Sequence, residues 1–374
     1  MAGIYIHVPF CRQACRYCDF YFTVSLKYIE DYVSALLKEI DQRKDVIEAE
    51  KINTIYFGGG TPSVLTFSKL KQVLTKINET LLVSVNAEIT LEANPDDLSK
   101  KYLGELKNAG INRLSIGVQS FYQDDLSLMR RSHSETQSIE CINEANSAGF
   151  DNINMDLIYG VPGLSMQKWE HNLKTAINLP VKHLSAYHLS YEAGTVFHHW
   201  RKKGKLKETE ENTSVEQFIM LQQMTQEHGF EHYEISNFAK EGFRSKHNSS
   251  YWENKTYLGL GPAAHSFNGK ERAWNVSSLK NYIELVKVGE GYNEKEKLSE
   301  KDRLNDYLII TLRTKWGANV EYVKQEFGDA TQESLLRSAE TYIHEGTMML
   351  NQGMLHIKAD HWLKADMIIR ELIV

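Results

Sequence analysis

Short hydrophobic runs alternate with amphipathic stretches through the first half of the chain. The runs are rich in Ile, Val, Leu or Tyr and are bounded by Gly, Pro or Asn, so each one predicts a β-strand. These strands are expected at residues 4–8, 54–57, 87–91, 113–117, 152–158 and 183–189. The stretches between them place hydrophobic residues at spacings of three and four, which predicts helices. Helices are expected at residues 28–43, 67–79, 136–148 and 166–178.

A succession of strand–helix units predicts an α/β fold with a parallel sheet and right-handed crossovers, either doubly wound or curled into a partial barrel. In such sheets the chemistry collects at the carboxyl ends of the strands. Several notable segments obey that rule, namely a loop rich in cysteine, residues 58–62, Glu92, Gln119 and Asp156. We therefore expect them to lie together at the carboxyl ends of the strands, an end of the barrel that we call the mouth.

The alternation stops after residue 190. Near the end of the chain, residues 348–350 and 354–357 predict a hairpin among helices. We expect three parts, which are a core barrel (1–235), a connecting segment (236–298) and a C-terminal helical or winged-helix-like domain (299–374). Acidic residues slightly outnumber basic ones in the last part, which favours a structural wing over a DNA-binding one.

Composition narrows the class of protein. The net charge is −6 without a long basic block, so no nucleic-acid partner is expected. No hydrophobic stretch approaches the ~18 residues that a membrane span needs, and we expect a chain that does not span a membrane. The first eight residues lack a basic region and a long hydrophobic run, so no signal peptide is expected. Together with the clustered cysteines, these features predict a protein of the reducing cytoplasm.

Three of the four cysteines lie close together, as Cys11, Cys15 and Cys18 in a C-x₃-C-x₂-C pattern. Thiolates suit iron–sulfur clusters, in which a cubane takes one thiolate for each iron. Three cysteines leave one of the four irons without a protein ligand. A small molecule can coordinate such an open position and be activated there.

Two alternatives compete with the cluster. A Cys₃His zinc site could form with His7, although structural zinc usually draws its ligands from two separate loops. Cys15 and Cys18 could instead form a thioredoxin-like redox pair, which leaves Cys11 without a role. We favour the cluster over both. Cys141 lies within a predicted helix and is expected to be an inert core thiol.

The segment from Tyr5 to Phe20 (Tyr-Ile-His-Val-Pro-Phe-Cys-x₃-Cys-x-Tyr-Cys-Asp-Phe) resembles the radical S-adenosylmethionine (SAM) superfamily. It is most similar to the branch of oxygen-independent coproporphyrinogen III oxidases and the related haem chaperones of the HemW group. The resemblance extends through Asp156 to His265 and covers nearly the whole chain. It implies a partial (β/α)₆ TIM-like barrel with a C-terminal domain.

The resemblance also implies the cofactors and their ligands. The three neighbouring cysteines would hold a [4Fe–4S] cluster, and SAM would chelate its open iron. Glycines would let the backbone approach the methionyl group of SAM, which residues with a Cβ would block. A carboxylate suits the ribose hydroxyls or the amine, and an arginine suits the carboxylate. The implied SAM positions are Tyr5, Gly58, Gly59, Gly60, Thr61, Glu92, Gln119, Arg131 and Asp156. For Glu92 and Asp156 the alternative is charge at a strand end, and for Tyr5 it is simple packing.

Two features separate the branches of this family. The oxidases carry a further cysteine two places after the third ligand, where this chain has Phe20, and an extension ahead of Tyr5. Residues 247–252 (His-Asn-Ser-Ser-Tyr-Trp) match the H-N-x-x-Y-W signature of the chaperones. We therefore expect a haem chaperone that passes haem to apo-haemoproteins. Radical oxidation of coproporphyrinogen III is the alternative, and radical modification of tRNA is a third.

His247 and Tyr251 are the expected haem-binding residues, because imidazole ligates haem iron and an aromatic ring can pack on a porphyrin. A histidine beside aromatic residues can equally be a hydrogen-bonded core residue. His198 and His199 are a second candidate pair. The expected partners are haem, apo-haemoproteins such as membrane cytochromes, an electron donor of the flavodoxin or ferredoxin kind, and a second copy of the chain in a homodimer.

Overall fold

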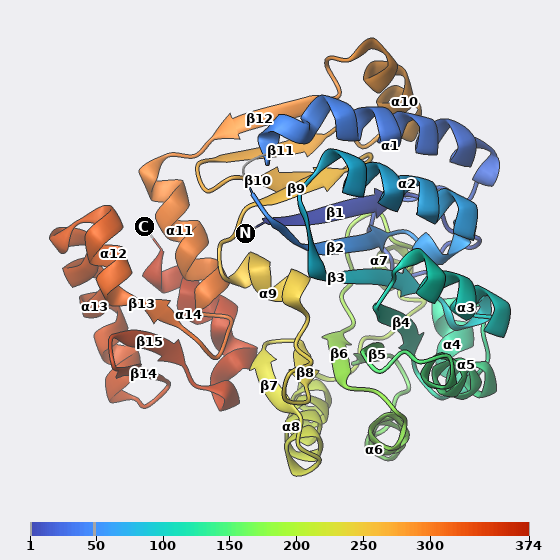
Figure 1. Ribbon diagram of the computed structural model, residues 1–374. Helices are drawn as coiled ribbons and strands as arrows, with labels where there is room; N and C mark the ends of the chain where they lie inside the picture. Colours follow the sequence, from blue (N-terminus) through green and yellow to red (C-terminus); the bar gives the residue numbers. More distant parts are fainter. Residues whose placement is uncertain (1, 48–49, 374) are drawn as a thin grey trace.

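The computed structural model describes residues 2–47 and 50–373, and its first six strands lie side by side in parallel (Figure 1). These strands are β1 (Ala2–Val8), β2 (Ile52–Gly59), β3 (Val83–Ala93), β4 (Arg113–Gln119), β5 (Ile153–Tyr159) and β6 (His183–His188). The predicted α/β fold and its six strands are confirmed, and most strands extend beyond the predicted ends.

The sheet curls into a partial barrel, and helices cover its outer face (Figure 1). They are α1 (Ile29–Arg43), α2 (Phe67–Thr80), α3 (Lys100–Ala109), α4 (Gln123–Met129), α5 (Glu135–Ser147), α6 (Met166–Asn178), α7 (Val196–Lys202) and α8 (Glu211–Glu227). The four predicted helices correspond to α1, α2, α5 and α6. Each buries a hydrophobic stripe, as α1 does with Val33, Leu36 and Ile40.

The inner face of the barrel is polar, because successive side chains of a strand point to opposite faces. In β4, Arg113, Ser115 and Gln119 alternate with hydrophobic residues that join the core. All seven residues of that strand are buried. The barrel therefore has an ordinary hydrophobic core outside the sheet and a hydrogen-bonding interior.

Residues after the barrel extend the same sheet at both of its edges. The added elements are β7 (Glu231–Glu234), β8 (Asn237–Ala239), α9 (Lys246–Trp252), β9 (Tyr257–Leu260), β10 (His265–Phe267), β11 (Glu271–Asn275), α10 (Leu279–Val288) and β12 (Asn293–Lys297). Strand β9 pairs in parallel with β1, and β8 pairs antiparallel with β6. The sheet has twelve strands in the order β12-β11-β10-β9-β1-β2-β3-β4-β5-β6-β8-β7.

A buried carboxylate fastens this added segment to helix α1. Glu39 accepts hydrogen bonds from the backbone N–H of Gly261 (2.8 Å), from Asn275 Nδ2 (2.6 Å) and from the Tyr282 hydroxyl (2.6 Å). Its ion-pair partner is Arg43, at 3.3 Å. Burial raises the pKa of Glu39, and Arg43 with these hydrogen bonds offsets part of that cost.

The C-terminal elements form a separate hydrophobic cluster beside the barrel (Figure 1). They are α11 (Glu300–Thr311), β13 (Ala318–Asn319), α12 (Val320–Phe327), α13 (Asp329–His344), β14 (Met348–Asn351), β15 (Met354–Ile357) and α14 (Ala365–Leu372). The predicted hairpin is confirmed as β14 and β15, to which β13 adds a third strand. This arrangement of helices and a small antiparallel sheet agrees with the winged-helix-like expectation. The boundaries at residues 235 and 298 stay predictions.

Within the described residues, none of the helices combines the length and the hydrophobicity that a membrane crossing requires.

The close approach of Gly261 to strand β1 generates a stability prediction. A Cβ at Gly261 would lie 2.5 Å from the backbone oxygen of His7, at a φ of +93°. Gly269 has a similar φ of +90° but open space around it. We expect Gly269→Ala to lower the free energy of unfolding by about 1–2 kcal/mol through backbone strain alone. Gly261→Ala should cost at least ~1 kcal/mol more, as measured by urea denaturation. Equal losses would contradict the tight contact.

Candidate functional site

The loop after β1 carries the three clustered cysteines at the carboxyl end of the sheet. Cys11 is buried, Cys15 and Cys18 are partly accessible, and none of the three forms a disulfide. The backbone N–H of Cys11 donates to Thr23 (3.0 Å), and Thr61 Oγ1 donates to the Cys11 sulfur (3.4 Å). Hydrogen bonds from both sides therefore fix the first cysteine of the loop.

Residues between the cysteines hold the rest of the loop against the barrel. The Arg16 backbone N–H donates to Met129 (3.1 Å), and its guanidinium donates to the Leu128 carbonyl (2.9 Å). Gln13 Nε2 donates to the Arg130 carbonyl at 2.7 Å. The Arg16 guanidinium lies 4.7 Å from the ring centre of Trp200. These contacts order the loop without using its thiols.

Burial disfavours the thiolate forms of Cys11 and Cys18 in the absence of a metal. Burial raises the pKa of Cys11 and raises that of Cys18 to about 12. Coordination by iron deprotonates a thiol outright, which reverses that preference. Arg131 Nη1 donates to the Cys15 sulfur at 3.4 Å. No three His, Cys, Asp or Glu side chains within the described residues are grouped as ligands of one metal ion.

The zinc alternative required His7, and both ring nitrogens of this residue already have partners. Nε2 donates to the Tyr21 carbonyl at 2.9 Å, and Nδ1 lies 3.3 Å from the Tyr5 hydroxyl. Burial lowers the pKa of His7. The structure thus uses His7 in packing and hydrogen bonding beside the loop.

The glycine segment 58–60, at the end of β2, comes close to the cysteine loop. A Cβ on Gly60 would lie 2.8 Å from the Phe10 carbonyl oxygen and 3.0 Å from the Cys11 sulfur. A Cβ on Gly58 would lie 2.9 Å from the ring of Tyr5. Gly59 has a φ of +110°, in the region that favours glycine. This segment therefore offers bare backbone beside the thiols, as the cofactor prediction requires.

Two residues at the end of β4 and beyond have unusual environments. Gln119 has a φ of +73° at a register shift of the strand, and it is 8% exposed. A non-glycine residue held in this conformation is characteristic of functional sites. Arg131 Nη2 donates to Asn94 Oδ1 and to the Gly117 carbonyl, both at 2.6 Å. Arg131 Nε is buried without a partner among the described residues, so it can still donate to a carboxylate.

Two carboxyls deep in the barrel are tuned toward their neutral forms. Burial raises the pKa of Glu92 to about 7, and the nearby Asp156 adds to this shift. Burial raises the pKa of Asp156 to about 6. The Tyr56 hydroxyl donates to Glu92 (2.7 Å), and Asn154 Nδ2 donates to Asp156 (2.7 Å). A ligand with a positive charge would favour ionisation of both carboxyls.

The other end of the barrel is closed by helix α9, which carries His247. This residue is 1% exposed, and its ring stacks on Tyr56 at a centroid distance of 5.0 Å. Nδ1 hydrogen-bonds with Thr54 Oγ1 and Nε2 with the Tyr251 hydroxyl, both at 2.8 Å. Burial lowers the pKa of His247 to about 3, so its imidazole is neutral. In this conformation His247 is a hydrogen-bonded interior residue, and haem ligation by it stays a prediction.

Comparison with known proteins identifies the family. Residues 5–176 match the family described as the Radical SAM superfamily. A protein from Bacillus subtilis (strain 168) named "Heme chaperone HemW" is 35% identical over 94% of this chain and 98% of its own length. The chain belongs to the radical SAM superfamily, in the family of the HemW proteins. A Lactococcus lactis protein with the same name is 34% identical over 94% of this chain and 90% of that protein.

A solved structure shares the whole radical SAM fold. The coproporphyrinogen III oxidase HemN from Escherichia coli superposes with a TM-score of 0.86, covering 100% of this chain and 90% of that one. Its sequence identity is 22%, so the likeness establishes the fold and no more. The radical SAM family implies a [4Fe–4S] cluster and SAM, and the buried Arg131 Nε and the glycine segment fit such cofactors.

The predicted site residues fall into two groups in the structure. The three cysteines, the glycine segment, Gln119 and Arg131 lie at the mouth, with Glu92 and Asp156 below them on the inner strands. His247 and Tyr251 lie at the base instead. Sequence reasoning missed Arg113, whose buried charge acts on the pKa of Glu92 and Asp156. Its polar position in an otherwise hydrophobic strand run was the available signal.

Removal of one thiol tests the cysteine loop. We expect Cys15→Ala to abolish the brown colour and to lower iron and sulfide content after anaerobic reconstitution, because one iron loses its ligand. Cys141 is buried in α5, far along the chain from the loop, and Cys141→Ala is the matched control that should keep the cluster. A colourless wild type with stoichiometric zinc would contradict the cluster.

The raised pKa of Glu92 predicts how stability depends on pH. The folded apo-protein holds this proton where the unfolded chain has lost it, so stability falls as pH rises from about 4.5 to about 7. Glu92→Gln keeps an acceptor for Tyr56 and should flatten that fall, with a gain of about 2–3 kcal/mol at pH 8. Urea denaturation across this range measures it. The exposed Glu227→Gln is the control, and an unchanged pH profile in Glu92→Gln would contradict the assignment.

Proposed function

We propose that this protein is a haem chaperone, which binds haem together with a [4Fe–4S] cluster and SAM and transfers haem to apo-haemoproteins. The observation that carries the proposal is the similarity to proteins named "Heme chaperone HemW" along nearly the whole chain, including the segment from His247 to Trp252. Phe20, where the resemblance places a cysteine in the oxidases, is 65% exposed and offers no fourth thiol.

In this proposal Cys11, Cys15 and Cys18 hold the cluster, which leaves one iron for SAM. The glycine segment 58–60 and Thr61 receive the methionyl part. Arg131 binds its carboxylate through the unpartnered Nε. The remaining SAM contacts come from Tyr5, Glu92, Gln119 and Asp156. When bound, the cluster would supply one electron for the reduction of SAM. The enclosing barrel would keep water away from both cofactors.

His247 is the haem ligand in this proposal, and its surroundings supply two properties that a ligand needs. Its pKa of about 3 keeps the imidazole neutral, which is the form that coordinates iron. The hydrogen bond between Nδ1 and Thr54 fixes the ring in the way that an outer partner usually fixes a ligating histidine. Iron would then replace the Tyr251 hydroxyl at Nε2. Because His247 is 1% exposed on the inner face of α9, binding also requires this helix to move away from the barrel.

The proposed partners follow from this role. Haem recipients include membrane cytochromes, and a flavodoxin or ferredoxin supplies the electron. A homodimer is the proposed assembly. The compartment proposed is the cytoplasm.

A hemin titration tests the haem proposal. We expect the reconstituted protein to develop a Soret band at one haem per chain and to pass haem to an apo-cytochrome. His247→Ala should lower hemin affinity about tenfold or more, because one coordinate bond is lost. Low-temperature EPR of the wild type should show a histidine-ligated ferric haem.

The controls separate a lost ligand from a lost fold. His228 is exposed and lies at the end of α8, so His228→Ala should bind hemin as the wild type does. Cluster content serves as the folding check for His247→Ala. A wild type without a Soret band, or one that anaerobically converts coproporphyrinogen III, would refute the chaperone role.

A further inference from the structure

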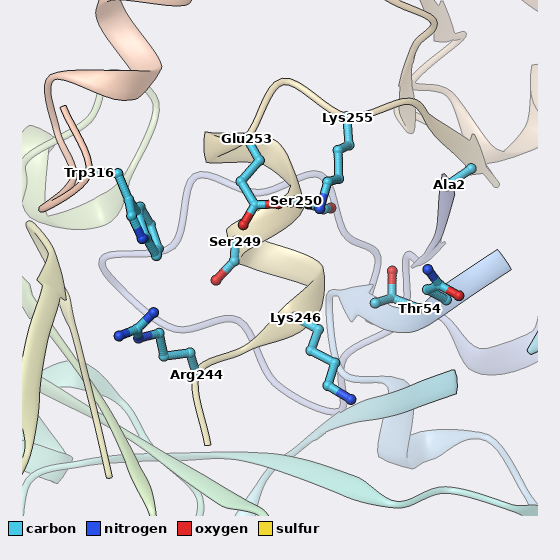
Figure 2. Close-up of a pocket in the computed structure, with 10 residues that line it drawn as sticks. Ala2, Thr54, Arg244, Lys246, Ser249, Ser250, Glu253, Lys255 and Trp316 are labelled. Atoms are coloured by element: carbon cyan, nitrogen blue, oxygen red, sulfur yellow. Dashed lines mark ion pairs between the residues drawn. The ribbon is translucent and has the colours of Figure 1, made fainter. Parts of the chain in front are cut away.

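A pocket of about 290 Å³ lies along the outer face of helix α9, at the base of the barrel. Its walls come from three parts of the chain, which are the starts of β1 and β2, helix α9 with its flanks, and the loop before β13 (Figure 2). The pocket adjoins the haem-binding candidate, because Thr54 lines it and also hydrogen-bonds to His247. Its volume is at the lower end of the range for small-molecule sites, so it suits one part of a larger ligand.

The pocket is positively charged in a chain whose net charge is −6. Arg244, Lys246 and Lys255 line it, against the single carboxylate of Glu253. Lys255 forms an ion pair with Glu253. Lys246 is exposed and forms no ion pair within the described residues, although its charge lowers the pKa of the buried Glu88. Its ammonium group is therefore accessible to a ligand. An excess of cations over carboxylates selects an anionic group.

Arg244 is held in place by an ion pair with Glu231, which is not a lining residue, and by Trp316, which lines the pocket. Its Nε donates to Glu231 at 2.8 Å, and its guanidinium lies 5.4 Å from the ring centre of Trp316. Figure 2 shows Arg244 and Trp316 together on one side of helix α9. A guanidinium fixed in this way loses little freedom when it binds an anion.

The pocket also contains a polar group without a partner. Ser249 is 8% exposed, and its hydroxyl is buried without a hydrogen bond among the described residues. In Figure 2 this hydroxyl points toward Arg244. A buried hydroxyl without a partner carries a free-energy cost that an incoming acceptor oxygen would remove. Charge and hydroxyl thus favour the same kind of ligand atom, an anionic oxygen.

A second pocket of about 270 Å³ adjoins the first and shares Glu253 and Trp316 with it. Three aromatic residues, Trp252, Tyr307 and Trp316, line it together with Glu253, Thr311, Thr314 and Gly317. The Trp252 indole N–H is buried without a partner among the described residues. The two pockets together suit a flat hydrophobic molecule that carries anionic oxygens at one edge.

We propose that the cationic pocket binds the carboxylates of an iron porphyrin while the adjoining aromatic pocket contacts its macrocycle. This subsite rests on the haem-chaperone function proposed above. It gives helix α9 two roles, since its outer face receives the porphyrin edge and its inner face carries His247. Carboxylate recognition then comes from Arg244, Lys246 and Lys255 with Ser249, on helix α9 and its flanks, which must move for iron to reach the imidazole.

Esterification of the porphyrin tests the subsite directly. Hemin and its dimethyl ester have the same iron and macrocycle, but the ester lacks the carboxylate charges. We expect the full-length reconstituted wild type to bind hemin about tenfold more tightly than the ester, by Soret titration and tryptophan quenching in one solvent mixture. The double variant Lys246→Ala/Lys255→Ala keeps only Arg244 among the three cations, so it should lose most of that preference and bind the ester as the wild type does.

A control variant and three possible results of these titrations decide the test. Lys203→Ala/Lys205→Ala removes the same charge from an exposed loop and should keep the tenfold preference. Equal wild-type affinity for hemin and its ester would overturn the subsite and leave the haem proposal standing. A preserved preference in the Lys246/Lys255 variant would overturn it as well. Absence of any hemin binding by the wild type would refute the proposed function itself.

Discussion

Burial of charged side chains inside a curved parallel sheet is the constraint on which this structure depends. Arg113 is 1% exposed on the inner face of β4, and its Nε and Nη2 have no hydrogen-bond partner among the described residues. Its charge lowers the pKa of Glu88, Glu92 and Asp156 against the effect of burial. Burial makes these three carboxyls costly to ionise, and the Arg113 guanidinium offsets part of that cost.

The same interior links the two ends of the barrel. Below the mouth, Glu92 accepts a hydrogen bond from Tyr56, whose ring stacks on His247 at the base. Tyr5 stacks on both rings, with centroid distances of 6.2 Å to Tyr56 and 6.4 Å to His247. The proposed SAM and haem sites are therefore separated by one layer of packed aromatic side chains. Helix α9 belongs to that layer on one face and to the cationic pocket on the other.

Much of the barrel and its mouth could be predicted from local sequence. The strand runs were identifiable because parallel strands covered by helices need β-branched residues, and the cysteine spacing is itself a local pattern. The base of the barrel, which is the end closed by helix α9, could not be predicted in this way. Residues 229–278 are rich in Gly and Asn and showed no periodicity, yet they form β7 to β11 and helix α9. Their short strands gain stability only from distant partners, as β9 does from β1.

The role of His247 shows the same limit at the level of one side chain. Sequence could offer this histidine as a haem ligand or as a core residue, because its partners Thr54 and Tyr56 lie almost two hundred positions away. The cationic pocket was equally hidden, since its wall combines Ala2 and Thr54 near the start of the chain with α9 and the distant Trp316. Spatial convergence of distant segments leaves no trace in spacing or composition.

The position of β1 in the sheet has a consequence for biosynthesis. This strand leads into the cysteine loop and lies between β2 and β9, so one of its two neighbours is made only when residues 257–260 leave the ribosome. Such long-range pairing slows folding and exposes an unpaired strand edge in the meantime. The cysteine loop therefore gains its complete supporting sheet only after residues 257–260 have been made.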